Sequence, residues 1–257
     1  MITSITNQRI KNVIRLKKST QIRRKQHCFI VEGPRMFFEV PVSALREVYL
    51  TEEFEQKYKN QLSELEYELV SEAVLHRLSD TTTPQGVVAV VSQPGTSLEQ
   101  IMKGDPLPCI ILLESIQDPG NLGTILRTAE AAGISGVIMN KDTVDPFHPK
   151  VIRSTMGAVF RVPFHVAGDL HGVISRLRDE GYDIYAAHLD GQVFYDADFK
   201  RPCAFLIGNE GNGLTPETTA LCDCRIRIPM EGKVESLNAS VAASLIMYEV
   251  LRQRRSW

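Results

Sequence analysis

Three short segments in the second half of the chain combine glycine, asparagine and charged residues where an apolar run ends. They are residues 118–127 (DPGNLGTILR), 208–213 (GNEGNG) and 228–240 (IPMEGKVESLNAS). In an α/β protein such segments form the loops beyond the strand tips, which is where ligands bind. We therefore expect the three segments to build one ligand site.

The first segment places Asn121 at the start of a helix expected over residues 121–132 and places Arg127 one and a half turns inside it. The free N–H groups of a helix N-terminus attract anions, and a guanidinium adds donors for a phosphate or a ribose oxygen. Alternatively, Asn121 only caps the helix and Arg127 is a surface cation. The preceding Asp118-Pro119-Gly120 favours the ligand site.

The second segment follows a strand expected over residues 203–207. Its three glycines permit positive φ angles and a close approach of the backbone to a ligand, and Glu210 has no obvious local partner. The segment is not a P-loop, because no Lys-Ser/Thr follows it, and it lacks the G-x-G-x-x-G spacing of dinucleotide-binding loops. An ordinary turn is the alternative.

The third segment ends a strand at Pro229 and leads into an apolar helix expected over residues 237–252. Either Ser236 or Asn238 can cap this helix. The polar groups at the helix start exceed what capping needs; they are Glu235, Ser236, Asn238 and Ser240. Along the helix, one face carries apolar residues suited to a core or to a subunit interface, namely Val241, Leu245, Tyr248 and Leu251.

The remaining pattern predicts an α/β protein with two domains. In the first part, helices are expected from residues 7, 34 and 72, and strands at 28–31, 48–50, 67–70 and 87–91. Residues 93–107 are rich in proline and glycine and are expected to form a linker with one short helix at 97–103. In the second part, strands are expected near 110–113, 137–139, 162–166, 183–187, 203–207 and 225–228, with a proline-rich turn at 145–149.

Composition is ordinary for a soluble globular protein, with 43% hydrophobic and 23% charged residues, and no membrane span or secretory signal is expected. The five cysteines are odd in number and lie mostly in apolar runs, which favours buried free thiols in a reducing cytoplasm. Cys222 and Cys224 lack the usual zinc spacing and a nearby histidine partner, so we assign no metal site.

Charge is unevenly distributed along the chain, although the formal net charge is only −2. Residues 1–31 contain no acid and eight basic residues: Arg9, Lys11, Arg15, Lys17, Lys18, Arg23, Arg24 and Lys25. Residues 52–72 contain seven glutamates. A basic arm indicates contact with phosphates, whose neutralisation releases counterions. A solvated terminal helix with a skewed surface is the alternative, and the three segments favour the first.

In this order, the three segments resemble the SpoU family of RNA ribose 2′-O-methyltransferases, within the SPOUT superfamily. The resemblance spans roughly residues 108–252 and is carried by Asn121-x-Gly123 with Arg127, by Gly208-Asn209-Glu210-Gly211, and by Ile228-Pro229-Met230 with residues 235–240 (ESLNAS). A looser resemblance to the substrate-binding domain of many SpoU enzymes is carried by residues 24–26 (RKQ) before Phe29, 31–33 (VEG) and 84–87 (PQGV).

The resemblance implies a small N-terminal α/β RNA-recognition domain (1–92), a linker (93–107) and a SPOUT α/β domain (108–257) with a C-terminal trefoil knot. It also implies S-adenosylmethionine as cofactor, RNA as substrate and a cytoplasmic homodimer whose active site is completed across the dimer. The positions that match the cofactor-binding set are Gly208, Ile228, Met230 and Leu237. The positions that match the catalytic set are Asn121, Arg127, Glu210, Ser236 and Asn238.

A division of roles follows from chemistry. A guanidinium stays protonated, so Arg127 is expected to clamp a phosphate and stabilise a developing alkoxide rather than act as a base. Glu210 would orient Arg127 or accept the proton, and Ser236 and Asn238 would position the sugar and the cofactor-binding loop. In a family-like segment between the first two motifs, we interpret Arg153 as a candidate RNA contact and Gly157 as a packing residue.

Three histidines, His148, His165 and His188, are interpreted as turn or core residues rather than bases, because nothing in the motifs points to them. Among substrates, ribosomal RNA is favoured over transfer RNA, because a separate N-terminal recognition domain is typical of ribosomal RNA modifiers in the family. Transfer RNA stays open as a substrate. So does an inactive RNA-binding or ribosome-assembly protein, although the intact polar cluster argues against it.

Overall fold

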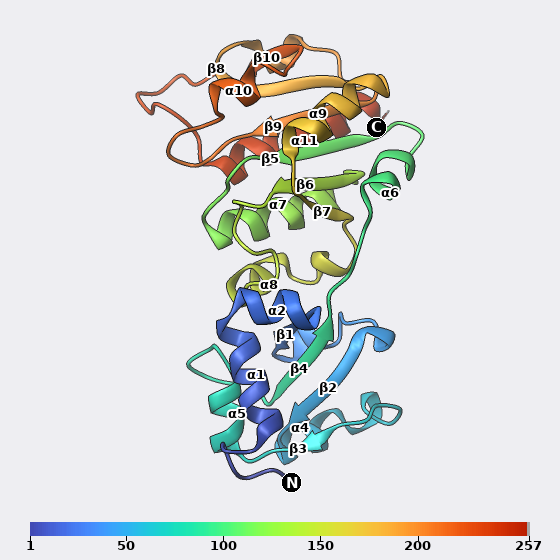
Figure 1. Ribbon diagram of the computed structural model, residues 1–257, viewed down its shortest axis with the longest axis vertical. Helices are drawn as coiled ribbons and strands as arrows, with labels where there is room; N and C mark the ends of the chain where they lie inside the picture. The colour runs from blue at the N-terminus through green and yellow to red at the C-terminus, as the bar shows by residue number, and fades with distance from the viewer. Residues whose placement is uncertain (256–257) are drawn as a thin grey trace. The chain divides into compact units, whose positions relative to one another are not determined.

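The computed structural model describes residues 1–255 and divides the chain into two compact units. Unit 1 comprises Met1–Pro94 together with Asp145–Phe160, and unit 2 comprises Gly95–Val144 and the chain from Arg161 onward. Both are mixed α/β structures, which confirms the predicted fold class (Figure 1). Among the described residues, no helix is long and apolar enough to cross a membrane.

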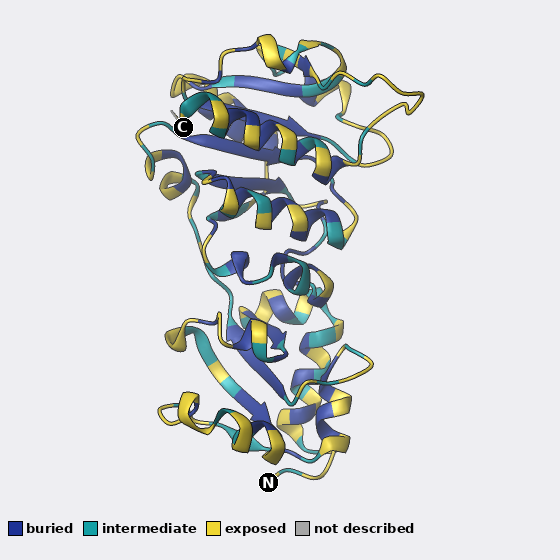
Figure 2. Cartoon of the chain, turned by 180° about the vertical axis from the view of Figure 1, so that it is seen from behind, coloured by how far each residue is buried: buried dark blue, intermediate teal, exposed yellow. Residues whose placement is uncertain are grey.

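Unit 1 contains a four-stranded sheet with the order β1-β4-β2-β3. Its strands are β1 (Cys28–Glu32), β2 (Leu45–Leu50), β3 (Glu68–Leu69) and β4 (Val87–Ser92). The strand β4 pairs antiparallel with β1 and β2, whereas β3 pairs parallel with β2. Residues 87–91 are all buried, which explains why this strand is a continuous apolar run in the sequence (Figure 2).

The helices of unit 1 are α1 (Gln8–Lys18), α2 (Thr20–Gln26), α3 (Pro34–Phe37), α4 (Glu52–Tyr58), α5 (Glu72–Leu78) and α8 (Pro149–Thr155). Side-chain oxygens of Asn7, Ser19, Thr51 and Ser71 cap four of them. The apolar face of α1 is buried with that of α5 in one core cluster over the sheet. The expected helices and strands of this part are present, with α1 beginning one residue after its cap and α3 ending at Phe37, three residues before the predicted Val40. The helices α2 and α4 were not predicted.

A turn was predicted at 145–149 and no helix after it, but residues 149–155 form α8, and the segment 145–160 packs within unit 1. Its helix begins at Pro149, and the His148 side chain accepts a hydrogen bond from the Lys150 amide. Arg23, which is 1% exposed, donates from Nε and Nη2 to Asp145 at 2.8 and 2.6 Å. The sequence placed Arg23 in a basic arm that contacts phosphates. In the structure it is instead a buried residue that stabilises unit 1.

Unit 2 contains a six-stranded sheet with the order β10-β8-β9-β5-β6-β7, and every pairing is parallel. Its strands are β5 (Cys109–Leu113), β6 (Gly136–Asn140), β7 (Phe164–Ala167), β8 (Asp183–Val193), β9 (Cys203–Ile207) and β10 (Cys224–Arg227). β5 and β9 lie at the centre and are buried at every residue, as parallel strands covered on both faces should be. The parallel sheet brings the strand tips to one edge.

The helices of unit 2 are α6 (Leu98–Lys103), α7 (Pro119–Ala131), α9 (Leu170–Asp179), α10 (Pro216–Thr219) and α11 (Ala239–Arg254). The helices α9 and α6 pack on the face of the sheet that carries Ile110 and Leu112, whereas α11 packs against α7 (Figures 1 and 2). The helix predicted at 97–103 is confirmed, and Ser97 closes a capping box with Gln100.

Two helix starts differ from the prediction. The helix α7 begins at Pro119 rather than at residue 121, because Asp118 accepts a hydrogen bond from the Asn121 amide and is the cap. The helix α11 begins at Ala239 rather than at 237, because Asn238 is its cap. The division of the chain into functional domains at 1–92, 93–107 and 108–257 stays a prediction; the compact units differ from it in placing residues 145–160 in unit 1.

Candidate cofactor and catalytic site

A cavity of about 390 Å³ opens at the strand tips of unit 2. It lies beyond Ile207 at the end of β9 and Ile226 in β10. The loops 208–214 and 226–230, together with residues 235–237, form most of its wall. The second and third sequence motifs therefore meet in one cavity, at the edge where α/β sheets bind ligands.

All four residues predicted to bind the cofactor line this cavity; they are Gly208, Ile228, Met230 and Leu237. Of the predicted catalytic residues, Glu210 and Ser236 line it as well. Ser236 is exposed, so its hydroxyl is accessible. Asn121, Arg127 and Asn238 are not among the lining residues.

The glycine-rich loop closes on itself at Gly208. A Cβ atom at this position would lie 2.2 Å from the backbone of Gly213 and Leu214, which is closer than any side chain allows. Asn209 and Gly213 exchange two backbone hydrogen bonds of 2.9 Å, and Gly213 has a φ of +69°. The fold of the loop therefore requires glycine at this position.

Asn209 holds this loop in place. Its Oδ1 accepts hydrogen bonds from the amides of Gly211 and Asn212, and its Nδ2 donates to the carbonyl of Ser115 at 2.8 Å. Ser115 follows β5 and has a φ of +58°, an unfavourable conformation for a residue with a Cβ atom. Asn140 at the end of β6 fixes it by accepting from its amide and donating to its hydroxyl.

Glu210 connects the second motif to the first. Its carboxylate accepts hydrogen bonds from the backbone amides of Gln117 and Asp118 and from Asn121 Nδ2, the last at 3.0 Å. These donors lie at the N-terminus of α7, where unpaired amides and the helix dipole favour an anion. The anion expected at this helix end is therefore supplied by the chain itself.

Asn121 also connects the first motif to the third. Its Oδ1 accepts a hydrogen bond of 2.9 Å from Asn238 Nδ2, and Asn238 Oδ1 accepts in turn from the amides of Ser240 and Val241. Each end of the buried Asn121 amide is thus used by a different motif. The structure joins all three sequence motifs in one hydrogen-bonded chain: Glu210, Asn121 and Asn238.

These hydrogen bonds determine the charge state of Glu210. Burial alone would raise the pKa of its carboxyl group, but the hydrogen bonds from Asn121 and from the amides of Gln117 and Asp118 outweigh burial and lower the pKa below its usual value. The carboxylate is therefore ionised at neutral pH and a weak proton acceptor.

Arg127 is placed differently. It is exposed on α7, and among residues 1–255 it has neither a hydrogen bond nor an ion pair. In particular, the predicted contact in which Glu210 orients Arg127 is absent from the described structure, because the carboxylate is directed to the amides at the helix N-terminus. The guanidinium is available to a ligand or to a second chain.

Sequence reasoning missed a buried network beside the cavity. Glu114, directly after β5, accepts hydrogen bonds from the amide and hydroxyl of Thr215 and from the hydroxyl of Thr218. His171 Nε2 lies 2.8 Å from the same Thr218 hydroxyl. The network fixes the chain where it leaves the glycine loop. The sequence signal that could have indicated this network is Glu114 itself, a charged residue immediately after an apolar strand. In the structure Glu114 is only 7% exposed.

The three histidines occupy local positions. His148 caps α8, and burial lowers its pKa. His165 Nδ1 lies 3.1 Å from the Thr96 carbonyl. His188 lines the cavity, where its Nδ1 accepts from the Asp190 amide within a turn. Their interpretation as turn or core residues is consistent with these contacts.

An all-parallel sheet with a glycine-loop cavity at its tips and a polar cluster on the adjoining helix starts defines a SPOUT-like methyltransferase domain. Comparison with family models matches residues 108–248 to the SpoU rRNA Methylase family and residues 7–89 to the MRM3-like substrate binding domain. The chain belongs to the SpoU family of RNA 2′-O-methyltransferases, as the sequence predicted.

Individual relatives support the same assignment. The chain is 31% identical to the 23S rRNA (guanosine(2553)-2′-O)-methyltransferase RlmP of Bacillus subtilis, over 97% of this chain and 98% of that protein. An AdoMet-bound rRNA methyltransferase from Sinorhizobium meliloti superimposes with a TM-score of 0.86 at 30% identity, covering 99% and 98% of the two chains. The TrmH/SpoU tRNA modifying enzyme of A. aeolicus, at 26% identity and a TM-score of 0.52, covers only 61% of this chain and 80% of its own.

The Asn121–Asn238 contact gives a first prediction. Replacing Asn238 by alanine removes the cap of α11 and leaves Asn121 Oδ1 without its donor, so we expect a loss of about 1 kcal/mol in stability and at least a roughly tenfold loss of turnover. Denaturant unfolding and steady-state kinetics measure the two effects.

A matched control is Ser97→Ala, which removes the cap of α6 in the same unit. It should lower stability by a similar amount and leave turnover unchanged. Equal effects of the two variants on turnover would show that Asn238 acts only through stability.

Proposed function

We propose that the chain transfers a methyl group from S-adenosylmethionine to a ribose 2′-hydroxyl in structured RNA, most favourably ribosomal RNA. The observation that carries the proposal is the single cluster in unit 2 that unites the three family motifs through Glu210, Asn121 and Asn238. Beside this cluster lies a cavity of about 390 Å³, within the range of small-molecule sites.

The residues of the cavity fit S-adenosylmethionine. Apolar side chains such as Ile228, Met230 and Leu237 offer a surface for the adenine ring, and the loop after β9 offers backbone groups. Glu210 and Ser236 supply polar groups for the charged part of the cofactor. When bound, the cofactor supplies an electrophilic sulfonium methyl group.

The chain's own residues then have the task of positioning. Asn121 and Asn238 fix the starts of α7 and α11, and Ser236 is placed to bind the sugar or the cofactor loop. Arg127 clamps an RNA phosphate and stabilises negative charge on the attacking oxygen. Glu210 is a positioning residue rather than the base, because its pKa is lowered and its oxygens already accept hydrogen bonds.

Ribosomal RNA is favoured over transfer RNA by the extent of the matches. The RlmP protein of Bacillus subtilis and the Sinorhizobium meliloti rRNA methyltransferase match nearly the whole chain, including unit 1. The A. aeolicus tRNA modifying enzyme matches 61% of this chain. Unit 1 would then recognise the ribosomal substrate. The proposal also includes the C-terminal trefoil knot and a cytoplasmic location, both of which are typical of the family.

The first experiment supplies the purified chain with methyl-labelled S-adenosylmethionine and total RNA from cells that lack the gene. We expect label in one ribosomal RNA, at a single 2′-O-methylated ribose located by fragment mapping. Label in transfer RNA would show that transfer RNA, and not ribosomal RNA, is the substrate. Cofactor binding without transfer to any RNA, including RNA from assembly intermediates, would favour the inactive RNA-binding protein.

Arg127→Ala tests the role of the free guanidinium in the same assay. We expect turnover to fall by about 10²–10³-fold, while the affinity for S-adenosylmethionine measured by calorimetry stays unchanged. Near-normal turnover of this variant would refute the assigned role.

A homodimer is part of the proposal, and α11 supports it. Three large side chains at helical spacing on one face of α11 remain exposed in the described structure: Val241 by 46%, Leu245 by 39% and Tyr248 by 49%. The sequence left open whether this stripe belongs to a core or to a subunit interface, and exposure favours the interface. The helix α11 packs against α7, the helix that carries Arg127.

Leu245→Glu should therefore convert the protein to a monomer and reduce methyl transfer. Light scattering coupled to gel filtration measures the mass at each concentration. Val42→Glu is the control, since Val42 is a large exposed apolar residue of unit 1 outside α11. A wild-type monomer at micromolar concentration, or a dimeric Leu245→Glu variant, would contradict the assigned interface.

The basic arm divides into structural and free cations. Arg9 is paired with Glu47 and Glu68, and Lys17 donates to the carbonyls of Arg77 and Ser79. By contrast, three exposed residues of α1 have neither a hydrogen bond nor an ion pair within residues 1–255, and they recur at i, i+4 and i+7 on one face: Lys11, Arg15 and Lys18. This stripe suits the phosphates of an RNA helix.

Replacing Lys11, Arg15 and Lys18 by glutamine should weaken RNA binding. The plot of log association constant against log salt concentration should become less steep, its negative slope decreasing in magnitude by roughly 2 to 3. Filter binding to ribosomal RNA over a range of salt concentrations measures the slope. Arg9→Gln is the matched control, because its charge is already neutralised by two glutamates. An unchanged slope in the triple variant would leave the stripe without a role in binding.

A further inference from the structure

Unit 1 contains a cleft of its own, distinct from the cavity of unit 2. It has a volume of about 230 Å³ and is lined by three segments that are far apart in the sequence. These are the turn between β1 and α3, the loop 79–85 before β4, and the end of α8. Each carries one of the sequence patterns that the methyl-transfer site leaves unused: residues 31–33, 84–87 and 153–158.

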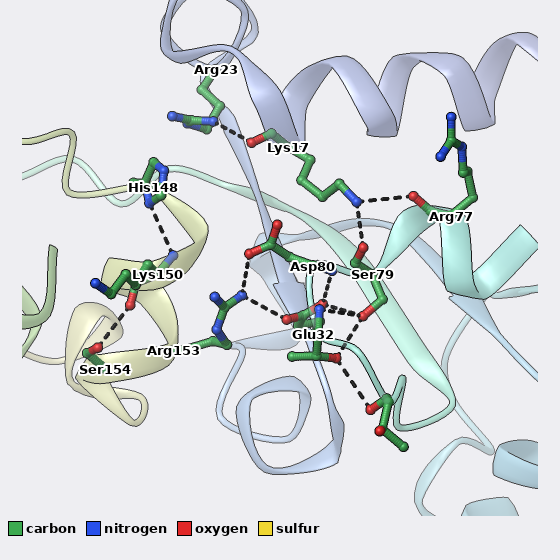
Figure 3. Close-up of polar contacts among 12 residues, drawn as sticks. Lys17, Arg23, Glu32, Arg77, Ser79, Asp80, His148, Lys150, Arg153 and Ser154 are labelled. Carbon is green, nitrogen blue, oxygen red and sulfur yellow. Dashed lines mark hydrogen bonds and ion pairs between the residues drawn. The ribbon is translucent and has the colours of Figure 1, made fainter.

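A fixed ion cluster forms one wall of the cleft. Arg153 Nη1 donates to Glu32 and to Asp80, each at 2.9 Å, and Glu32 also accepts from the hydroxyl of Ser79 and the amide of Asp80 (Figure 3). Within the described residues, Arg153 makes its hydrogen bonds through Nη1, so its Nε and Nη2 donors are left for a ligand while the side chain is held in place.

Two further polar groups in the cleft are available. Arg35 is exposed, and no hydrogen bond or ion pair engages it within the described part of the chain. The amide of Gln85 lies over Gly33, where a Cβ atom would come within 2.7 Å of Gln85 Oε1. Gly33 has a φ of +80°, so both its conformation and the room for Gln85 require glycine.

The other side of the cleft is apolar and polarizable, because Met36 and Met156 contribute to its lining. Thioethers pack well against flat aromatic groups. Arg153 pairs with Glu32 in the cleft and with Asp80 next to it, and Arg35 adds a further cation. The carboxylates are therefore neutralised and do not repel an anion.

From this combination we propose that the cleft binds one unstacked nucleotide of the RNA substrate. Arg35 and the free edge of Arg153 bind its phosphate, Gln85 hydrogen-bonds the edge of its base, and the base packs against Met36 and Met156. Arginine forks suit phosphate oxygens, and proteins that recognise RNA sequence do so mainly on bases splayed out of the stack. The inference rests on the proposed function only in taking RNA as the substrate.

The test uses the full chain labelled with ¹³C at the methionine methyl groups and a pool of RNA hexamers of random sequence. The chain has seven methionines, so each methyl resonance can be assigned by single Met→Leu variants. We expect the hexamers to shift Met36 and Met156 in a saturable manner. Met102, buried in unit 2, should not move.

Arg35→Gln and Gln85→Ala should each weaken the shifts at Met36 and Met156 about tenfold in apparent Kd. The matched control is Arg77→Gln, which removes an exposed cation of the same unit. The guanidinium of Arg77 is directed away from the Glu32–Arg153 cluster (Figure 3). Hexamers that leave Met36 and Met156 unmoved, or an equal loss in the Arg77→Gln variant, would overturn the proposal.

Kinetics separate this proposal from the proposed function. Arg35→Gln should raise the KM for the RNA substrate about tenfold and leave kcat unchanged. Methylation by this variant with an unchanged KM would contradict nucleotide binding in the cleft and support the methyltransferase activity. Hexamer binding that depends on Arg35, without methylation of any RNA, would support nucleotide binding in the cleft and contradict the methyltransferase activity.

Discussion

The side-chain amide of Asn121 is the interaction on which the site depends. Its Nδ2 donates to Glu210 and its Oδ1 accepts from Asn238, so one buried group joins loops that are 89 and 117 residues away in the sequence. An amide can do this because it presents a donor and an acceptor in a fixed geometry. An aspartate at this position would place a second carboxylate against Glu210 and would lack the donor. The start of α7 thus determines the positions of both the glycine loop and the start of α11.

The same contact explains why a carboxylate stands at the centre of a site that handles a cationic cofactor and an anionic substrate. Glu210 is stabilised as an anion by the amides at the N-terminus of α7, and its lowered pKa keeps it charged at neutral pH. Its charge therefore holds the loop in place and complements a sulfonium, while its lowered pKa makes it a poor base. Its position in the loop serves alignment, which is the main requirement when the methyl donor is already reactive.

The sequence was sufficient for the alternation of elements and for the residues at the strand tips, because apolar runs and the polar residues that follow them are local signals. It was insufficient where the partner is distant. The contact between Asn121 and Glu210 and the burial of Arg23 against Asp145 depend on tertiary packing. The cap of α7 was assigned to Asn121 although Asp118 precedes a proline at the first helical position, a local signal for the helix start that was overlooked. The helix α8 was missed because two prolines suggested only a turn.

Arginine shows most clearly why residue type does not define a role. Arg23 is buried and paired, so it holds unit 1 together. Arg153 is paired through one nitrogen and its side chain is 34% exposed, so it is oriented by the chain and able to bind a ligand. Arg127 is exposed and, within residues 1–255, unpaired, although it lies one and a half turns from a fully hydrogen-bonded cluster. A guanidinium that is left unpaired within the described residues is available to a group from outside the chain, and RNA and a second subunit both provide one.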